Sequence, residues 1–217
     1  MPLCDILTPY SAPWVGWLML SVFLMLVWIT IVNPRWITDS LATMFARVER
    51  RYTRTASSRV AEIVSRLFAV CTLAFALYLA LYNDRSFKMG TYWAIAGIIV
   101  AIGIAKVAIM FGLNGIFRFY KPFKLVVGHY LNIWKMTCFF LYIVSLAALQ
   151  GLSVKVTIVL YGAVMALFLL AVTVSAFRTL CFKPISVLYI TIYLLTLEVL
   201  PLAALYRLTE EVIAYYE

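Results

Sequence analysis

Six apolar runs, each about as long as a membrane-spanning helix, dominate the sequence. A helix needs about 20 mostly apolar residues to cross the hydrocarbon core of a bilayer. The sequence therefore predicts an all-α, polytopic membrane protein with about six transmembrane helices. No Lys or Arg precedes the first run, so we interpret it as a retained span and not as a signal peptide. The expected spans are residues 13–32, 66–82, 91–111, 132–150, 156–177 and 185–206.

Little of the chain remains for any other domain. The sequence is 65% hydrophobic and 12% charged, whereas a soluble domain carries about 25% charged residues. We therefore expect residues 1–217 to form a single integral membrane domain in contact with the lipid bilayer. The net charge of +9 does not indicate nucleic-acid binding, because the sequence has no soluble basic module. One histidine and four scattered cysteines predict neither a metal site nor a cofactor.

The basic residues alternate between the two sides of the predicted spans. Cytoplasmic loops of membrane proteins are enriched in Lys and Arg. The basic-rich side should therefore be cytoplasmic, which places both termini on the outer, periplasmic side. That side holds Arg35, Arg47, Arg50, Arg51, Arg54, Arg59, Arg66, Arg118, Lys121, Lys124, Arg178 and Lys183. The opposite side holds Arg85, Lys88, Lys155 and Arg207.

Two of the predicted cytoplasmic segments have a pattern of their own. Residues 37–54 place apolar side chains on one helical face and arginines on the other, which predicts a short amphipathic helix. This helix would lie on an anionic membrane surface or pack on its own bundle. The stretch GIFRFYKPFKLVVGHY (115–130) alternates aromatic and basic residues, which is typical of the membrane–water boundary. It predicts an interfacial helix or shallow re-entrant turn, with Arg118, Lys121 and Lys124 as candidates for binding a lipid headgroup or a phosphate.

Small residues recur on one face of two predicted spans. They are Gly97, Ala101, Ala105 and Ala108 in the third, and Gly162 and Ala166 in the fifth. Because small residues let helices approach closely in lipid, we interpret these faces as packing seams, either within the chain or with a partner's helix.

Three ionisable residues lie inside predicted spans: Lys106, Lys135 and Glu198. A charged group at a helix centre costs on the order of 2.5–3.5 kcal/mol, so each should pair with another group, face the bundle interior or line water. Lys106 and Lys135 lie near the cytoplasmic boundary, which a long side chain can reach. Glu198 lies about 20 Å along its span, just past mid-membrane, and cannot reach either boundary.

The surroundings of Glu198 predict a buried polar site. Pro201 lacks an N–H and leaves a carbonyl of the preceding turn without its usual helical partner. Thr191 lies two turns before Glu198 on the same face. We expect a polar network that joins Glu198 to Lys135, with Asn132, Tyr142 or Thr191 as further members. It would either hold helices together or serve as a proton or ion pathway.

Three stretches carry a family resemblance: NPRWITDSLATMF (33–45), NIWKMTC (132–138) and YITIYLLTLEVLPLAALYRL (189–208). The chain resembles the polytopic inner-membrane family of Bacteroidota catalogued as domain of unknown function 4271. The resemblance covers most of the chain. It implies a bacterial inner-membrane protein and no particular activity, and it singles out Lys135 and Glu198. It is most specific at Asn132, Lys135, Thr196, Glu198 and Pro201.

These features leave three classes of function open. The first is a non-enzymatic accessory or assembly subunit of a cell-envelope complex, such as a secretion or surface-biogenesis machine, bound to a membrane-protein partner or to copies of itself. The lack of catalytic motifs favours it. The second is a small proton-coupled transporter that uses Glu198, although the sequence shows no inverted repeat. The third is a membrane enzyme acting on lipid-linked substrates, with Glu198 or His129 as acid or base. Their different depths argue against a shared site.

Overall fold

The chain is all-helical in a computed structural model, which describes residues 13–34, 36–38, 56–81, 88–117, 120–180 and 199–216. This part of the chain contains no strand, and the expected all-α fold is confirmed. The elements are α1 (Pro13–Val32), α3 (Ala56–Leu81), α4 (Met89–Phe117), α5 (Tyr120–Leu149), α6 (Val154–Leu180) and α8 (Leu200–Tyr216). Five of these helices, α1, α3, α4, α5 and α6, are long and apolar enough to cross a membrane.

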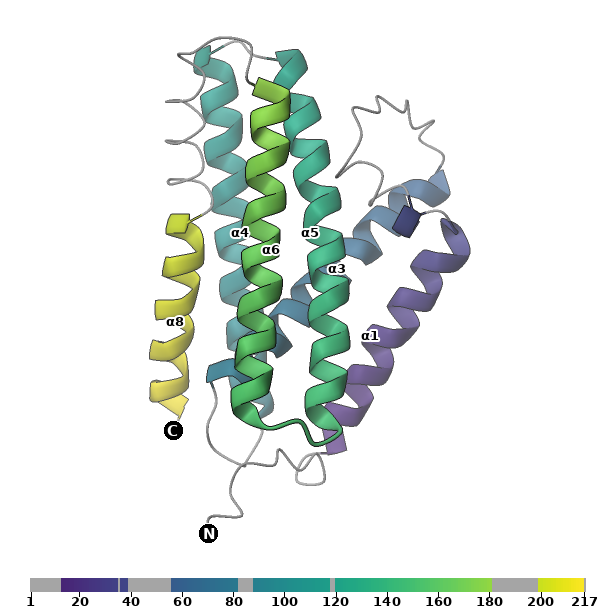
Figure 1. The fold of residues 1–217 in the computed structure, drawn as a ribbon, viewed down its shortest axis with the longest axis vertical. Helices are drawn as coiled ribbons and strands as arrows, with labels where there is room; N and C mark the ends of the chain where they lie inside the picture. Colours follow the sequence, from purple (N-terminus) through teal and green to yellow (C-terminus); the bar gives the residue numbers. More distant parts are fainter. Residues whose placement is uncertain are drawn as a thin grey trace.

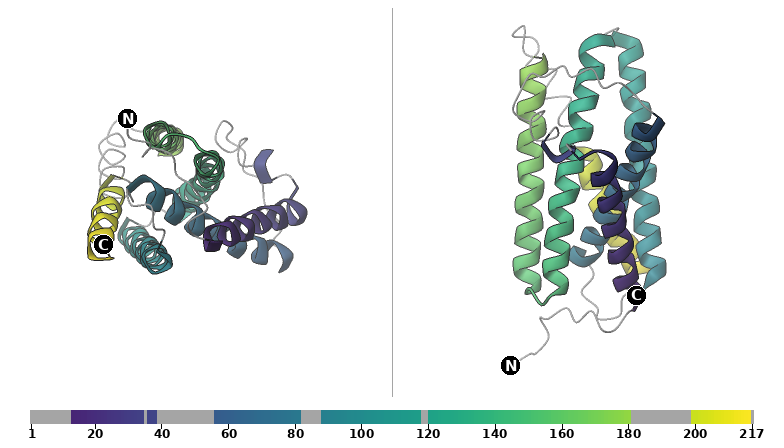
Figure 2. Two further views of the ribbon diagram at one scale, coloured as in Figure 1. Left: turned by 90° about the horizontal axis from the view of Figure 1, so that it is seen from below. Right: turned by 90° about the vertical axis from the view of Figure 1, so that its right-hand side faces the viewer.

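Helix α3 occupies the centre of the bundle. Helices α4, α5 and α6 run nearly parallel, while α3 crosses the bundle obliquely from α1 toward α8 (Figures 1 and 2). Helix α3 packs against α1, α4, α5, α6 and α8. In its most apolar stretch 56% of the residues are buried, against 22% in the corresponding stretches of α1, α4 and α6. The other helices are therefore arranged around α3.

The sequence of α3 explains this role. Ala69, Ala74 and Ala76 are buried and let neighbouring backbones approach closely, while Phe68 and Phe75 fill the spaces between helices. In lipid, helices associate through such close packing, because lipid tails are as apolar as the side chains themselves. Interleaved small and aromatic side chains thus let α3 contact several helices at once.

Polar side chains fix the helices that surround α3. The Tyr142 hydroxyl on α5 donates to the Met19 carbonyl of α1 over 3.3 Å. The Tyr78 hydroxyl at the end of α3 accepts the Lys88 N–H over 2.7 Å, just before α4 begins. Between α5 and α6 the chain turns at Gly151, whose φ of 107° favours glycine. These contacts set how neighbouring helices meet.

Several helices extend beyond the apolar runs. Helix α3 begins at Ala56, ten residues before the expected start at 66, because Glu62 and Arg66 form an ion pair one turn apart (2.7 Å) while Ala61 and Ser65 face the bundle. The stretch expected to form a separate interfacial segment instead continues α4 to Phe117 and begins α5 at Tyr120. Pro122 lies in the first turn of α5, where a proline is tolerated.

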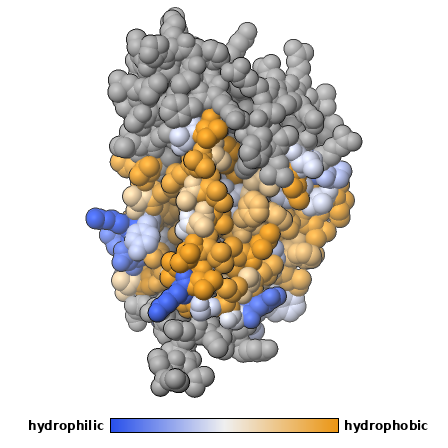
Figure 3. Space-filling view, in the orientation of Figure 1, coloured by the Kyte–Doolittle hydropathy of each residue, from blue (hydrophilic) through white to orange (hydrophobic). Residues whose placement is uncertain are grey.

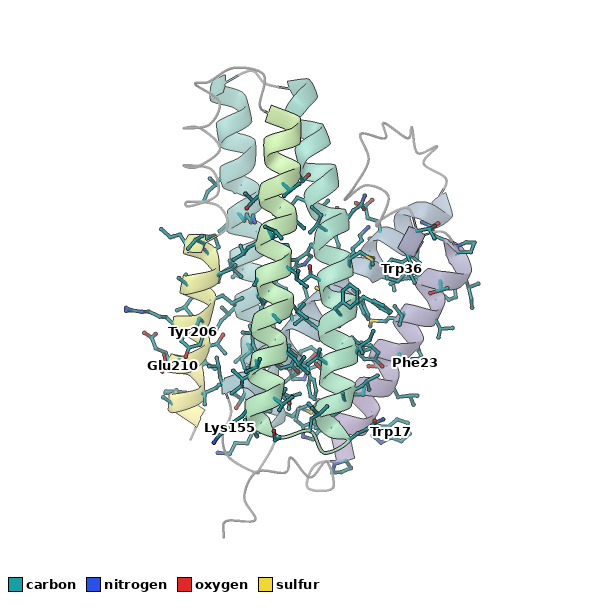
Figure 4. All side chains as sticks on the ribbon, in the orientation of Figure 1. Trp17, Phe23, Trp36, Lys155, Tyr206 and Glu210 are labelled. Carbon is teal, nitrogen blue, oxygen red and sulfur yellow. The ribbon has the colours of Figure 1, made fainter. Side chains whose placement is uncertain are left out.

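Helix α8 overlaps the last expected span only at residues 200–206. Residues 185–198 lie outside the described part of the chain, and the helix described there begins at Leu200 and continues past residue 206 to Tyr216. Leu205, Thr209 and Ile213 recur every four residues and are buried, and α8 packs on α4. Tyr206 and Glu210 project away from the bundle (Figure 4). The helix can continue past residue 206 because it is amphipathic, with one face packed on the bundle and the other turned away from it.

A broad apolar surface covers the described part of the face shown in Figure 3. On α1, Trp17, Leu24 and Ile31 are exposed, and Trp17 and Phe23 stand on its outer side (Figure 4). This pattern fits helices in contact with lipid. The predicted amphipathic helix at 37–54 lies almost wholly outside the described residues. Just before it, the buried Trp36 ring meets Phe139 of α5 edge-on, with 5.9 Å between ring centroids.

The small-residue faces point outward in the isolated chain. Gly97, Ala101, Ala105 and Ala108 of α4 are all exposed, as are Gly162 and Ala166 of α6. A Cβ placed on Gly97 or Gly162 would meet no heavy atom within 4 Å. The interpretation of these faces as seams within the chain is therefore wrong. The small residues that pack inside the bundle instead belong mainly to α3.

We predict that Phe75→Ala destabilises the protein by about 3 kcal/mol, the low end of the range for removing a buried Phe side chain. The fully buried Phe75 ring fills space between helices, and its loss leaves a cavity. The same substitution at the half-exposed Phe23 removes few internal contacts and should change stability little. Unfolding of both variants in mild detergent checks this. Equal losses for the two would contradict the central role of α3.

Candidate functional site

Lys135, one of the three ionisable residues expected inside the spans, faces α3. It is partly buried on α5 and interacts electrostatically with Glu62 and Arg66. The Glu62 carboxylate accepts a hydrogen bond from the Arg66 guanidinium over 2.7 Å. The two cations and one carboxylate form a charged cluster between α3 and α5. Asn132, one turn before Lys135 on α5, is also partly buried.

Sequence reasoning missed Glu62. We expected the second span to begin at residue 66, which placed Glu62 in a cytoplasmic loop. The four-residue spacing of Glu62 and Arg66, directly before an apolar run, is the signal that predicts a helical ion pair. A helix that starts before its apolar stretch brings such a pair level with residues of the neighbouring helix.

Lys106 forms a second polar contact, between α4 and α5. Its ammonium donates to the Tyr130 hydroxyl over 2.6 Å and lies 3.9 Å from the centroid of the Tyr130 ring. A cation over an aromatic face is stabilised by about 0.5–2 kcal/mol, the larger value applying where water is excluded. The side chain therefore reaches sideways to α5. The described parts of α4 and α5 make few other contacts, because both pack on α3.

Aromatic rings surround this lysine contact. Tyr130 stacks on Trp134, one turn further along α5, with 6.4 Å between ring centroids and 13° between planes. Phe168 of α6 meets both rings edge-on, at 6.0 Å from Tyr130 and 5.2 Å from Trp134. We call Lys106, Tyr130, Trp134 and Phe168 the lysine–aromatic cluster. It joins α4, α5 and α6, and the four-residue spacing of Tyr130 and Trp134 is its sequence signal.

Buried hydroxyl groups inside the bundle serve as links between and within helices. Ser145 of α5 and Tyr161 of α6 share a hydrogen bond of 2.8 Å. Thr72, Thr137 and Thr209 each donate to a carbonyl of the preceding turn of their own helix. Within the described residues no group of three or more histidine, cysteine or carboxylate side chains has the arrangement of a metal site.

The other predicted site residues are placed only in part. Glu198 and Thr191 lie outside the described residues, and so does Arg118. Lys121 and Lys124 lie in the first turns of α5, and their side chains are outside the described part. Pro201 lies in the first turn of α8. Tyr142 donates to the Met19 carbonyl of α1, and its ring meets Phe68 of α3 edge-on with 6.0 Å between ring centroids. The expected network around Glu198 remains a prediction.

The fold and these contacts define an all-helical protein of the integral-membrane class, with charged and aromatic contacts between its helices. Residues 15–209 match the model of the family described as a domain of unknown function, DUF4271. The match covers most of the chain, so the protein belongs to this family. No curated protein and no solved structure shows significant similarity to it.

We predict that the charges of Glu62 and Lys135 are energetically coupled. Glu62→Gln leaves Arg66 and Lys135 without the carboxylate between them, whereas Lys135→Met leaves the Glu62–Arg66 pair intact. Because Glu62 and Arg66 are partly exposed, we expect a coupling free energy of about 0.5–1 kcal/mol. Unfolding of the two single variants and the double variant in detergent measures it.

Glu210, exposed on α8, provides the matched control. Glu210→Gln combined with Lys135→Met should give additive changes in the free energy of unfolding. If the Glu62 and Lys135 variants are also additive, to within about 0.3 kcal/mol, the charged cluster is not an energetic unit.

Proposed function

We propose that this protein is an accessory or assembly subunit of a cell-envelope complex in the bacterial inner membrane, such as a secretion or surface-biogenesis machine. The observation that carries the proposal is the outward face of α4, where Gly97, Ala101, Ala105 and Ala108 are exposed. Small residues allow a second helix to approach the backbone closely in lipid. A partner helix, from another protein or from a second copy, would cover this face.

Charge and topology support the orientation that we propose. Helix α1 begins and α8 ends at the same end of the bundle (Figure 1). The segments that join helices at the opposite end, between α1 and α3, α4 and α5, and α6 and α8, contain seven of the 18 arginines and lysines, against two in the other connections. By the positive-inside rule this basic end faces the cytoplasm, and both termini face the periplasm.

We predict that Gly97→Leu abolishes partner binding and leaves the stability of the isolated protein nearly unchanged. A Cβ at Gly97 would meet no heavy atom within 4 Å, so a larger side chain begins in open space in the isolated chain, but it would hold a partner's helix away. Gly16 of α1 is the matched control, because it is also exposed and also has open space around its Cβ. Gly16→Leu should keep the partner. Gentle purification of each tagged variant, with mass spectrometry of the bound proteins, makes the comparison.

A photo-crosslinking residue at position 101 identifies what covers the face. A crosslink to another membrane protein indicates a hetero-complex, and a crosslink to the same chain indicates a homo-oligomer. If Gly97→Leu and Gly16→Leu retain the same proteins in the same amounts, the α4 face is a lipid-facing surface and the proposal fails.

A proton-coupled carrier is the second candidate function. Glu198 is a carboxylate that the sequence places just past mid-membrane, and Pro201 follows in the first turn of α8. Ionisable residues inside a membrane frequently mark proton or ion pathways. A carrier requires proton-dependent uptake that Glu198→Gln abolishes and Glu210→Gln leaves intact. Uptake that survives Glu198→Gln would exclude this mechanism.

A further inference from the structure

We propose that the outward face of α8 binds the same face of α8 in a second copy of the chain. The face goes beyond the proposed function, because the partner described there covers a different surface, on α4. Its residues share one side of the helix, opposite the side that packs on the bundle, by their spacing of i, i+4, i+7 and i+11. They are Ala203, Arg207, Glu210 and Ala214, with Glu211 at the edge, and all five are exposed.

The charges of this face lie at the level of the lipid acyl chains. Helix α8 packs alongside α4 and ends close to the level of the turn between α5 and α6 (Figures 1 and 2). The candidate spans of α4 and α6 begin at this same end, at Met89 and Val154. Along α8, Glu211, Glu210 and Arg207 lie about 7.5, 9 and 13.5 Å from the last turn at Tyr216.

The residues that mark the membrane boundary lie closer to this end. In Figure 4, Trp17 and Lys155 both lie nearer the end of the bundle than Glu210 does. Tryptophan and lysine are typical of the membrane–water boundary. The sequence predicted that Arg207 lies outside the last span, whereas the structure packs its helix against a membrane-spanning neighbour. The charged face of α8 is therefore directed sideways within the membrane.

Contact with lipid is unfavourable for such a face. Charged side chains in the hydrocarbon region pair with one another, face protein or line water. The carboxylates of Glu210 and Glu211 are too short to reach the boundary, and in the described part of the chain neither forms an ion pair with Arg207. The Glu210 side chain projects away from the bundle (Figure 4). A partner that carries charge of its own is needed to cover the face.

The charges of the face complement a second copy of themselves. Two identical chains in one membrane pair about a two-fold axis along the membrane normal, so their α8 helices run parallel and equal residues lie at equal depth. Arg207 of one copy then lies about 4.5–6 Å along the axis from Glu210 and Glu211 of the other. The long arginine side chain spans this difference, and its planar group can bind a carboxylate through two hydrogen bonds. Symmetry makes every such contact twice.

Small side chains on both sides of the charges let the two helices meet. Ala203 lies one turn before Arg207, and Ala214 lies one turn after Glu210. Small residues allow close approach of helices in lipid. On α1, by contrast, the exposed positions hold large side chains such as Trp17 and Leu24. The α8 face thus suits a second copy in shape as well as in charge.

Disulfide crosslinking in isolated membranes tests this contact. Ala203→Cys and Ala214→Cys each place a thiol beside the two-fold axis, so mild oxidation should join two copies into a covalent dimer. Gly16→Cys is the matched control, because Gly16 is a small exposed residue of α1. It should give no more dimer than the wild-type protein, which carries the four native cysteines.

Charge reversal tests the pairing of Arg207 with the carboxylates. Arg207→Glu makes the charges of the face all negative, and the double variant Glu210→Arg and Glu211→Arg makes them all positive. Each should lower the yield of the Ala214→Cys dimer at least about tenfold, because like charges then meet across the interface. Chains of the two kinds, co-expressed with different tags, should form a mixed dimer again.

Thermal unfolding in detergent shows whether each variant is folded. If a reversal variant does not fold, Arg207→Gln takes its place and should lower the dimer yield by a smaller factor, because it removes the attraction without adding repulsion. Gly97→Leu should leave the α8 dimer intact even where it loses the partner on α4, so failure of this dimer and failure of the proposed function are distinguishable.

Three results would overturn the α8 dimer. Yields from Ala203→Cys and Ala214→Cys no higher than from Gly16→Cys would mean that the face contacts lipid or water. A dimer yield that both reversals leave unchanged would mean that the charges pair within their own helix. A crosslink from these positions to a different protein, identified by mass spectrometry, would assign the face to another partner.

Discussion

Close packing around α3 is the constraint on which the rest of the structure depends. In a bilayer, burying an apolar side chain against another helix removes it from lipid and not from water, so shape determines association. Helix α3 satisfies this condition with alanines at the points of closest approach and aromatic rings between them. Because α3 crosses the bundle obliquely, it contacts each of the other described helices, and α1, α4 and α5 pack closely on it, while α6 packs mainly on α5 and α8 mainly on α4.

Polar contacts act where packing on α3 leaves neighbouring helices apart. Helices α4 and α5 are consecutive in the chain and make few direct contacts in the described part, yet Lys106 and Tyr130 join them. Ser145 and Tyr161 join α5 to α6, and Tyr142 joins α5 to α1. Lys106 and Tyr142 join pairs of helices that make few other contacts in the described part, whereas Ser145 and Tyr161 add a hydrogen bond between two helices that already pack extensively. The hydrogen bonds therefore fix relative positions, and the core supplies most of the contact area.

The sequence predicts the all-helical fold well, because the length of an apolar run reflects a requirement of the bilayer. Helix α1 occupies the residues expected for the first span. The other helix ends are less predictable. A helix can continue past its apolar stretch when it packs one apolar face on the bundle and turns a polar face outward. Helix α3 does this through Glu62 and Arg66, and α8 does it through an outward polar face opposite Leu205 and Ile213. Lys106 and Lys135 can be recognised in the sequence, because a charge inside a span is costly. Their partners, Tyr130 and Glu62, cannot be predicted in the same way, because they lie on other helices and a local sequence pattern does not show which helices meet.

The exposed faces of α1 and α4 differ in a way that bears on what each contacts. On α1 the exposed positions hold Trp17, Leu24 and Ile31, whose large side chains cover the backbone and present a rough apolar surface suited to fluid lipid. On α4 the exposed small residues leave a smooth strip along the backbone, bordered by Trp93, Val100 and Ile104. A flexible acyl chain gains little from such a strip, whereas a rigid helix gains close contact along its length.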